Sequence, residues 1–257
     1  MRSLGVVLSL AAALALAACG SRPTAPTPPP ITDPGGGTGT GTPPPPPPPP
    51  PTLNVTRILA FGDSMTEGTT SPSPTLFRLD AGLPQSYPFK LQVLQSERYS
   101  AQTITVMNAG KAGNKAEDDR ERLADAIKAA SPQVVLLLEG ANDINSGETV
   151  TQTVNALEDM VRDTEGLGIT VLLGTLPPQR PGQKNTAHAA VIPRLNDAIR
   201  AMAQKKGAIL VDVFAQFPLE LIGQDGLHPT EAGYQKLAEI FQAAIAAKWE
   251  QAPQTGR

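Results

Sequence analysis

The feature that most constrains the fold is an alternation of two hydrophobic patterns, which begins near Leu53 and continues almost to the end of the chain. Apolar runs of strand length alternate with stretches in which apolar residues recur every three or four positions. This alternation is typical of βα units built around a parallel sheet. The runs that we predict to be strands are Arg57–Phe61, Thr103–Met107, Gln133–Leu138, Ile169–Leu173 and Ala208–Val213.

Helical spacing separates these runs, so helices are expected to cover both faces of the sheet. Five parallel strands covered in this way predict a flavodoxin-like, doubly wound α/β fold with strand order 2-1-3-4-5. Thr230 is predicted to cap the last helix, and the charged run at residues 117–122 is predicted to face solvent. The apolar residues that mark the helices are Leu123 and Ile127; Val150, Val154, Leu157 and Val161; Val191, Leu195, Ile199 and Met202; and Tyr234, Ala238, Phe241 and Ile245.

The N-terminal part of the chain differs in composition and is predicted to lie outside the folded domain. Residues 1–18 contain Arg2 and an apolar stretch too short to span a bilayer, which is typical of a signal peptide. Residues 19–52 are rich in Pro, Gly and Thr and offer too little apolar surface to offset their ordering entropy. We therefore predict a disordered tether over residues 19–52, a folded domain over residues 53–250 and a disordered tail over residues 251–257.

The only cysteine, Cys19, follows small residues at the end of this leader. The segment Leu16-Ala17-Ala18-Cys19 is similar to the lipobox of bacterial lipoproteins, which implies cleavage before the cysteine and lipidation of its thiol. A chance cysteine beside an ordinary cleavage site is the alternative. The resemblance implies a lipid anchor in the bacterial cell envelope. Gly20, in place of an aspartate, favours the outer membrane, with the domain facing the periplasm or the cell surface.

The bulk composition argues against several kinds of partner. One cysteine cannot form an intrachain disulfide, so stability has to come from the apolar core. The formal net charge of −3 is small and its signs are well mixed, which argues against a nucleic-acid partner. With two histidines and no cysteine pair, a metal site is not expected, and no cofactor is predicted. The sequence makes no prediction of the oligomeric state.

Polar residues follow four of the predicted strands, at the edge of the sheet where open α/β folds bind their ligands. Each cluster alone is explained by ordinary turns, because Gly, Asn and Asp are common turn residues. Together they supply a hydroxyl, a base and several hydrogen-bond donors, which turns alone do not predict. The clusters are Gly62-Asp63-Ser64, Asn108-Ala109-Gly110-Lys111-Ala112-Gly113, Gly140-Ala141-Asn142-Asp143 and Asp225-Gly226-Leu227-His228-Pro229.

A serine hydroxyl needs a neighbouring base to act as a nucleophile near neutral pH. His228 lies three residues after Asp225, so the carboxylate can bind one ring nitrogen while the other nitrogen faces Ser64. Asp225 would then fix the tautomer of the imidazole and stabilise the imidazolium. His188 has no acidic residue at comparable spacing, so it is the weaker candidate for the base and is expected to line the cleft or to lie on the surface.

Acyl transfer builds negative charge on the former carbonyl oxygen, so hydrogen-bond donors have to point at that oxygen. Three donors are available at the predicted sheet edge. They are the backbone N–H groups of Ser64 and Gly110 and the side-chain amide of Asn142. Glycine at position 110 permits a close approach of the backbone.

With these clusters, the chain resembles the GDSL, or SGNH, hydrolase family over about residues 56–248. The four family blocks are, in the family's order, Gly62-Asp63-Ser64, Asn108-Ala109-Gly110, Gly140-Ala141-Asn142-Asp143 and Asp225-Gly226-Leu227-His228. The resemblance implies a three-layer α/β/α serine esterase with Ser64 as nucleophile, and with His228 and Asp225 as the base pair. It also implies oxyanion donors from Gly110 and Asn142. Met65 stands where the family name has leucine, which is a neutral apolar exchange.

Alternatives exist for the function and for the substrate. A tethered binding module can hold a phosphate or a glycan at the same sheet edge, but it has no need of Ser64 and His228. For an esterase with a small-molecule substrate, short-chain acyl, aryl or lysophospholipid-type esters are the main prediction, and acetylated glycans or cell-wall components are the second. The segments Thr69–Pro88 and Pro177–Ala187 are predicted to wall the pocket. The residues that either line an acyl slot or pack on the domain are Leu76, Phe77, Leu79, Leu83 and Tyr87.

Overall fold

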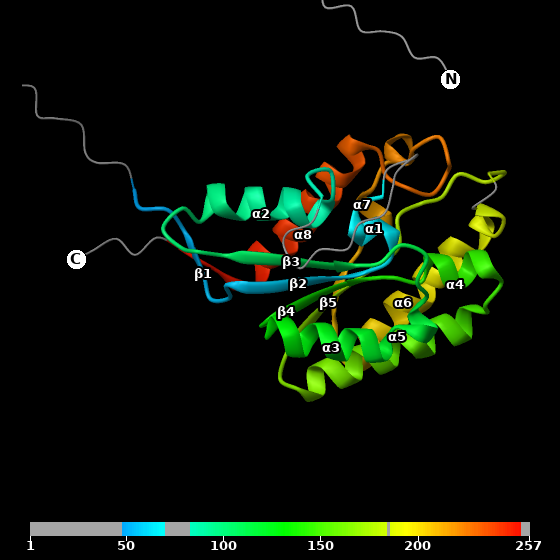
Figure 1. The fold of residues 1–257 in the computed structure, drawn as a ribbon, viewed down its shortest axis with the longest axis horizontal. Coiled ribbons are helices and arrows are strands. Elements are labelled where there is room, and N and C mark those ends of the chain that lie inside the picture. Colours follow the sequence, from blue (N-terminus) through cyan, green and yellow to red (C-terminus); the bar gives the residue numbers. More distant parts are fainter. Residues whose placement is uncertain (1–47, 70–82, 184–185, 253–257) are drawn as a thin grey trace, which may run out of the picture. The chain divides into compact units, whose positions relative to one another are not determined.

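Five parallel strands form the central sheet in the computed structural model, which describes residues 48–69, 83–183 and 186–252 (Figure 1). Within these residues the strand order is β3-β2-β4-β5-β6, which is 2-1-3-4-5 in chain order. The predicted doubly wound α/β fold is therefore confirmed. The strands are β2 (Arg57–Gly62), β3 (Thr105–Gly110), β4 (Val134–Leu138), β5 (Thr170–Gly174) and β6 (Ile209–Val211).

The register of three neighbouring strands places the predicted site segments side by side. Gly62, the last residue of β2, pairs with Gly110 of β3 on one side and with Leu138 of β4 on the other. Gly110 is the last residue of β3 and Leu138 is the last residue of β4, so all three strands end at the same level. The segments that follow them consequently start at one edge of the sheet.

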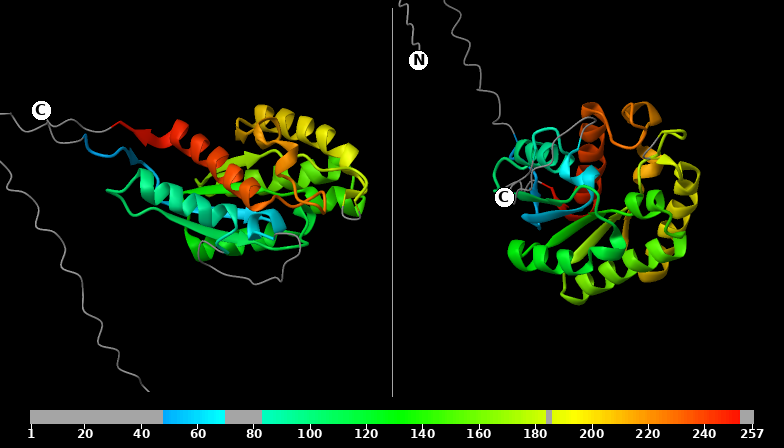
Figure 2. Two further views of the ribbon diagram at one scale, coloured as in Figure 1. Left: turned by 90° about the horizontal axis from the view of Figure 1, so that it is seen from above. Right: turned by 45° about the vertical axis from the view of Figure 1, so that its right-hand side comes forward.

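Helices cover both faces of the sheet, which is why its strands are continuous apolar runs. Figures 1 and 2 show a layer of helices on each face. One layer is α2 (Tyr87–Arg98) and α8 (Glu231–Trp249); the opposite layer is α3 (Arg120–Ala130), α5 (Val150–Gly166) and α6 (Ile192–Lys206). Thr230 caps α8 as predicted, because its side chain accepts the N–H of Gly233.

Short helical segments occupy the connections between these elements. They are α1 (Ser64–Glu67), α4 (Ala141–Ser146) and α7 (Val213–Gln216), together with the 3₁₀ turns η1 (Ala116–Asp118), η3 (Ala189–Val191) and η4 (Leu219–Leu221). Three of them, α1, η1 and α4, follow β2, β3 and β4, so they lie at the edge of the sheet where the site is expected.

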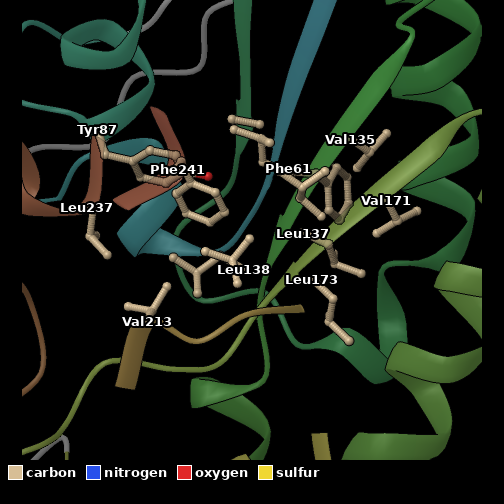
Figure 3. Packing of buried hydrophobic residues seen from close by; sticks show 14 of the residues in the cluster. Phe61, Tyr87, Val135, Leu137, Leu138, Val171, Leu173, Val213, Leu237 and Phe241 are labelled. Atoms are coloured by element: carbon tan, nitrogen blue, oxygen red, sulfur yellow. The ribbon is translucent and has the colours of Figure 1, made fainter. Parts of the chain in front are cut away.

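The apolar core lies on both faces of the sheet, because side chains alternate along each strand (Figure 3). On one face, Leu138 points towards the ring of Phe241 from α8, which stacks on Tyr87 from α2 with the ring centroids 5.2 Å apart. The group on the other face includes Phe61, Val135, Leu137, Val171 and Leu173. Each such side chain contributes about 1.5–3 kcal/mol by leaving water, so this packing holds the sheet without a disulfide.

Helix α2 is absent from the sequence predictions. Few of its residues face the core, and its buried positions include Gln95, so its hydrophobic period is weak. The signal that was available is local: Ser86 precedes Tyr87-Pro88, and the Ser86 hydroxyl accepts the N–H of Phe89 at 3.3 Å as a helix cap. Tyr87 therefore belongs to the core and not to an acyl slot.

The charged run at residues 117–122 faces solvent only in part, which corrects the sequence prediction. The Asp119 side chain is 1% exposed and the Arg122 side chain 19%. These two residues are three positions apart on the first turn of α3, so both turn towards the sheet. A run of alternating charges is typical of a solvent-exposed segment, so the sequence pattern does not indicate that Asp119 and Arg122 face inward as an ion pair.

A two-stranded antiparallel ribbon lies at the opposite end of the sheet from α1 (Figure 1). It pairs β1 (Thr52–Leu53) with β7 (Glu250–Gln251), and the Glu250 carboxylate binds Arg98 Nε at 2.6 Å and Tyr99 Oη at 2.7 Å. The chain therefore enters and leaves the domain away from the predicted site. No helix in the described ranges has both the length and the apolar character to cross a membrane.

Candidate active site

Ser64 lies directly after β2 and is the first residue of α1. Asp63 caps this short helix, because its Oδ1 accepts the N–H of Met65 at 2.9 Å. The Asp63 carbonyl oxygen also accepts the N–H groups of Thr66 and Glu67, at 3.1 and 2.9 Å. These bonds hold the turn rigidly, so the Ser64 hydroxyl and backbone N–H are fixed at the edge of the sheet.

His228 and Asp225 reach Ser64 from a segment 164 residues further along the chain. His228 Nε2 lies 2.8 Å from Ser64 Oγ, and His228 Nδ1 lies 2.5 Å from Asp225 Oδ2. The three side chains form one continuous line of hydrogen bonds. This geometry suits a hydroxyl nucleophile, a general base and an orienting carboxylate.

The loop that carries the imidazole is held by its own aspartate. Asp225 Oδ1 accepts the backbone N–H groups of Leu227 and His228, at 3.1 and 3.0 Å. Burial raises the pKa of Asp225, but the hydrogen bonds from the imidazole and from these two N–H groups outweigh it, so the pKa lies below its usual value. Asp225 is therefore ionised near neutral pH, as an orienting carboxylate has to be.

A cavity of about 350 Å³ opens beside Ser64 and His228. Asn142, in the first turn of α4, lies in its wall and donates one Nδ2 hydrogen to the carbonyl oxygen of Asn114 at 2.8 Å. An amide nitrogen carries two hydrogens, and within the described residues the second has no partner. The full lining is Ser64, Thr69, Ala112, Gly113, Asn142, Asn145, Ser146, Leu227 and His228.

The structure does not support Gly110 as a donor to this cavity. Gly110 ends β3, and its N–H donates to Asn108 Oδ1 at 2.9 Å. A Cβ there would lie 2.0 Å from the backbone nitrogen of Glu67, so glycine is needed for packing against α1. Gly113 does line the cavity, and its N–H has no hydrogen-bond partner among the described residues. Gly113 is therefore the better-placed donor from this segment.

The other predicted residues are placed as follows. His188 is exposed and borders a second cavity together with Arg194, so it does not line the cavity that contains Ser64. The segment Pro177–Ala187 contributes no side chain to the cavity within its described part; instead, the Arg180 N–H donates to the Gly226 carbonyl at 2.8 Å and braces the histidine loop. Cys19, Leu76, Phe77 and Leu79 lie outside the described residues.

The family of the chain follows from a comparison with known protein families. Residues 60–236, more than half of the chain, match the model of the GDSL-like Lipase/Acylhydrolase family. The chain belongs to this family. The membership makes it a carboxylic ester hydrolase by class, as the resemblance of its sequence blocks implies.

Individual relatives of this GDSL hydrolase agree with the class. An arylesterase from Vibrio mimicus is 23% identical over 190 residues, which cover 72% of this chain and 85% of that protein. A multidomain esterase from Ruminococcus flavefaciens is 26% identical over 153 residues, which cover 57% of this chain and only 20% of that protein. An acetylxylan esterase structure from Geobacillus stearothermophilus has a TM-score of 0.61 at 22% identity, covering 76% of this chain and 95% of the other. That likeness shows the fold alone.

Sequence reasoning about this GDSL hydrolase missed several cavity residues for identifiable reasons. The second strand was predicted to end at Met107, but β3 continues to Gly110, so the loop begins three residues later and exposes Gly113 instead. Asn145 and Ser146 lie one helical turn after Asn142 on α4. The spacing of three and four residues from Asn142 was the available signal. It shows that Asn145 and Ser146 share a helix face with Asn142 only once the helix itself is known.

Asp63, which directly precedes Ser64, is a fully buried carboxyl group. Burial raises its pKa to about 7, although the hydrogen bond from the Met65 N–H lowers it, and the nearby carboxylates of Asp143 and Asp119 raise it further. Its Oδ2 has no hydrogen-bond partner within the described part of the chain. Below about pH 7 this side chain therefore carries a proton.

The contribution of Asp63 to the stability of the enzyme is expected to fall as the pH rises from about 4 to about 7. In this range folded Asp63 keeps a proton that the unfolded chain, with the usual pKa of 3.8, releases. The shift corresponds to about 4 kcal/mol. Asp63→Asn keeps the Oδ1 acceptor but does not titrate, so we expect it to remove this decrease from the dependence of Tm on pH over this range. Equal pH slopes of Tm in both proteins would contradict the prediction.

Proposed function

We propose that this protein is a serine esterase that hydrolyses short-chain carboxylic esters through an acyl-serine intermediate. The observation that carries the proposal is the line of hydrogen bonds from Ser64 Oγ through His228 to Asp225. The line ends in the wall of an open cavity, so a substrate carbonyl can approach the Ser64 hydroxyl. A binding module has no use for such an arrangement, which makes the catalytic interpretation the better one.

The mechanism has two halves that use the same base. Ser64 Oγ attacks the ester carbonyl carbon while His228 Nε2 takes the hydroxyl proton, and the imidazolium then gives that proton to the departing alcohol oxygen. Water enters, His228 takes a proton from it, and the resulting hydroxide attacks the acyl-serine, which releases the acid and restores Ser64. Asp225 holds the Nδ1 proton in place and stabilises the imidazolium without accepting the proton itself.

We assign the oxyanion hole to the backbone N–H groups of Ser64 and Gly113 and to the free amide hydrogen of Asn142. All three residues line the same cavity. The Ser64 N–H has no recorded acceptor in the described ranges, since the turn bonds of α1 use the N–H groups of the residues after it. Donors that are already in place stabilise the developing negative charge without reorganising during the reaction.

The cavity favours a small acyl group. Only Ala112 and Leu227 bring apolar side chains to its described wall, whereas the other residues are polar or glycine. A long acyl chain needs a continuous apolar surface, because each buried CH₂ contributes about 0.8 kcal/mol. Short acyl esters of small, aryl or lysophospholipid-type alcohols therefore fit the described wall better than long-chain lipids do.

Acetyl esters of a glycan or of a cell-wall component are the second candidate. The same polar wall favours them, since Asn145 and Ser146 can bind hydroxyl groups of a sugar beside the reacting ester. The acetylxylan esterase with a similar fold acts on a substrate of this kind, according to its name. We rank this candidate second, because sugar-binding sites commonly use aromatic platforms and the described lining has no aromatic side chain.

The substrate proposal is tested with a panel of chromogenic esters of increasing acyl length and with acetylated sugars. We expect kcat/KM to be highest for acyl groups of about two to four carbons and at least about tenfold lower at about eight carbons. The Ser64→Ala protein serves as the blank in every assay. Highest rates on long-chain esters would contradict the short-acyl proposal, and a preference for acetylated sugars would select the second candidate.

The lipid anchor at Cys19 and the envelope location that it implies are part of the same proposal. Their support is the lipobox-like segment Leu16-Ala17-Ala18-Cys19 and the proline-rich tether. Mass spectrometry of the mature N-terminal peptide tests the anchor: an unmodified thiol at Cys19 would exclude it.

A further inference from the structure

A single side chain connects the ends of two strands beside the candidate active site. Arg122, in the first turn of α3, donates from Nη1 to the Ala109 carbonyl oxygen at 2.5 Å and from Nη2 to the Gly62 carbonyl oxygen at 3.0 Å. Gly62 ends β2 and Ala109 is the penultimate residue of β3. The guanidinium therefore fixes the spacing of the segments that lead to Ser64 and to Gly113.

The same guanidinium also connects to the amide in the cavity wall. Arg122 Nε donates to Asp119 Oδ1 at 2.8 Å, and Nη2 donates to Asp119 Oδ2. Asp119 Oδ1 in turn accepts a hydrogen bond from Asn114 Nδ2. The backbone carbonyl oxygen of Asn114 accepts a hydrogen bond from Asn142 Nδ2 at 2.8 Å. Two sets of hydrogen bonds, joined through the residue Asn114 itself, thus link Arg122 to the amide that we assign to the oxyanion hole.

This network is sheltered from water, unlike an ordinary surface ion pair. The Arg122 guanidinium carbon lies 3.9 Å from the centroid of the Phe61 ring, and the carboxyl of Glu139, which is fully buried, lies 3.7 Å from Nη2. Asp119 is 1% exposed. Planar guanidinium groups hold such bidentate geometry better than an ammonium group does, so the contacts define one arrangement of the strand ends.

We infer that Arg122 is a positioning residue for ester hydrolysis, which holds the oxyanion donors in place without touching the substrate. The inference rests on the proposed function. Stabilisation of an oxyanion depends on donors that are already aimed before the reaction, and a misplacement of about 1 Å is costly. Arg122 reaches the segments of all three donors: Ser64 through Gly62, Gly113 through Ala109, and Asn142 through Asp119 and Asn114.

The first test is Arg122→Lys, which keeps the charge but loses the planar fork. We expect kcat to fall by about 10–100-fold, with KM changed by less than about threefold, because the lost geometry serves the transition state. The matched control is Arg120→Lys, two residues earlier, where the arginine is half-exposed and pairs with Asp163 on the surface. The control is expected to leave kcat unchanged.

A second variant keeps the test valid if Arg122→Lys folds poorly. Asn114→Ala removes the side-chain link to Asp119 but keeps the backbone carbonyl that binds Asn142. We expect it to lower kcat in the same direction, by a smaller factor, with a Tm close to that of the wild type. A wild-type kcat in a folded Arg122→Lys protein, or in a folded Asn114→Ala protein, would overturn the inference.

A double-mutant cycle separates positioning from a merely structural role. If Arg122 acts partly through Asn142, the factor lost on Arg122→Lys has to be smaller in an Asn142→Ala background than in the wild type. Equal factors in both backgrounds would overturn the inference. Ser64→Ala runs in the same assay: full activity there would overturn the proposed function and this inference together, whereas an inactive Ser64→Ala beside a fully active Arg122→Lys defeats the inference alone.

Discussion

Replacing Ser64 by alanine is expected to abolish nearly all ester hydrolysis, with kcat lower by at least about 10³-fold. The physical reason is that, among the described residues, Ser64 carries the one hydroxyl that can give its proton to the imidazole of His228. Thr69 and Ser146 also line the cavity, but the imidazole nitrogen that faces the cavity is hydrogen-bonded to Ser64 Oγ. Rates on a short-chain chromogenic ester, measured with Tm for both proteins, check the prediction.

The histidine gives an equally sharp version of this prediction. His228→Ala removes the group that takes the Ser64 proton, so we expect a loss of turnover as large as that of Ser64→Ala. The losses should not add in the double variant, because the two side chains act as one unit. The chain has a second histidine, His188, which is exposed and does not line the cavity of Ser64, so His188→Ala is the matched control.

Controls decide how these results are interpreted. Ser146→Ala changes a hydroxyl in the same cavity wall that lacks the imidazole bond, and on a short-chain chromogenic ester, which has no sugar for Ser146 to bind, it is expected to keep most of the activity. If Ser64→Ala or His228→Ala retained wild-type turnover while folded, the proposed mechanism would be abandoned. A loss of activity with a collapsed Tm would instead show that the variant had unfolded.

The second large effect is expected at the oxyanion hole. Asn142→Ala removes the amide hydrogen that faces the cavity, so kcat is expected to fall by about 10²–10³-fold, with little change in KM. We expect kcat to change more than KM because negative charge develops on the carbonyl oxygen only in the transition state. The Asn142 amide therefore binds the carbonyl oxygen of the bound ester more weakly than the oxyanion. Steady-state kinetics on one ester, over a range that brackets KM, measure both quantities.

The matched control for this variant is Asn155→Ala. Asn155 lies exposed on α5, away from the cavity, so its loss is expected to change neither kcat nor KM. If KM of the Asn142→Ala protein rises while kcat stays constant, Asn142 binds the substrate and the transition state equally strongly. That result would remove Asn142 from the oxyanion hole and would leave the roles proposed for Ser64 and His228 intact.

The fold was largely predictable, because strand-length apolar runs and helical spacing are local properties of the chain. The strands predicted around Arg57 and Gln133 differ from β2 and β4 by one residue at one end. The helix α2 was not predictable in this way. Its residue Tyr87 stacks on Phe241, which lies more than a hundred residues further along the chain. A local hydrophobic period therefore does not indicate this helix.

The candidate site was predictable at positions where a residue of a chemically suitable type directly follows a predicted strand or has a suitably spaced partner. Ser64 follows a buried strand, and of the two histidines in the chain His228 is the one that has an aspartate three residues before it, so few candidates for the base remain. The donor glycine was not predictable. Gly110 and Gly113 are equivalent in the sequence pattern, and the structure separates them by the exact end of β3 and by the Asn108 bond to the Gly110 N–H.

The sequence by itself therefore determined the order of the strands and helices, the layered class and the identity of the nucleophile and base proposed here, because each is set by residue types at short spacing. Only the tertiary structure decided which donors face the cavity and that Arg122 and Asp119 turn inward beneath it. The physical reason is that hydrogen-bond partners and burial depend on the register of neighbouring strands and on helix rotation. Those quantities arise from contacts between distant segments, which a local pattern does not contain.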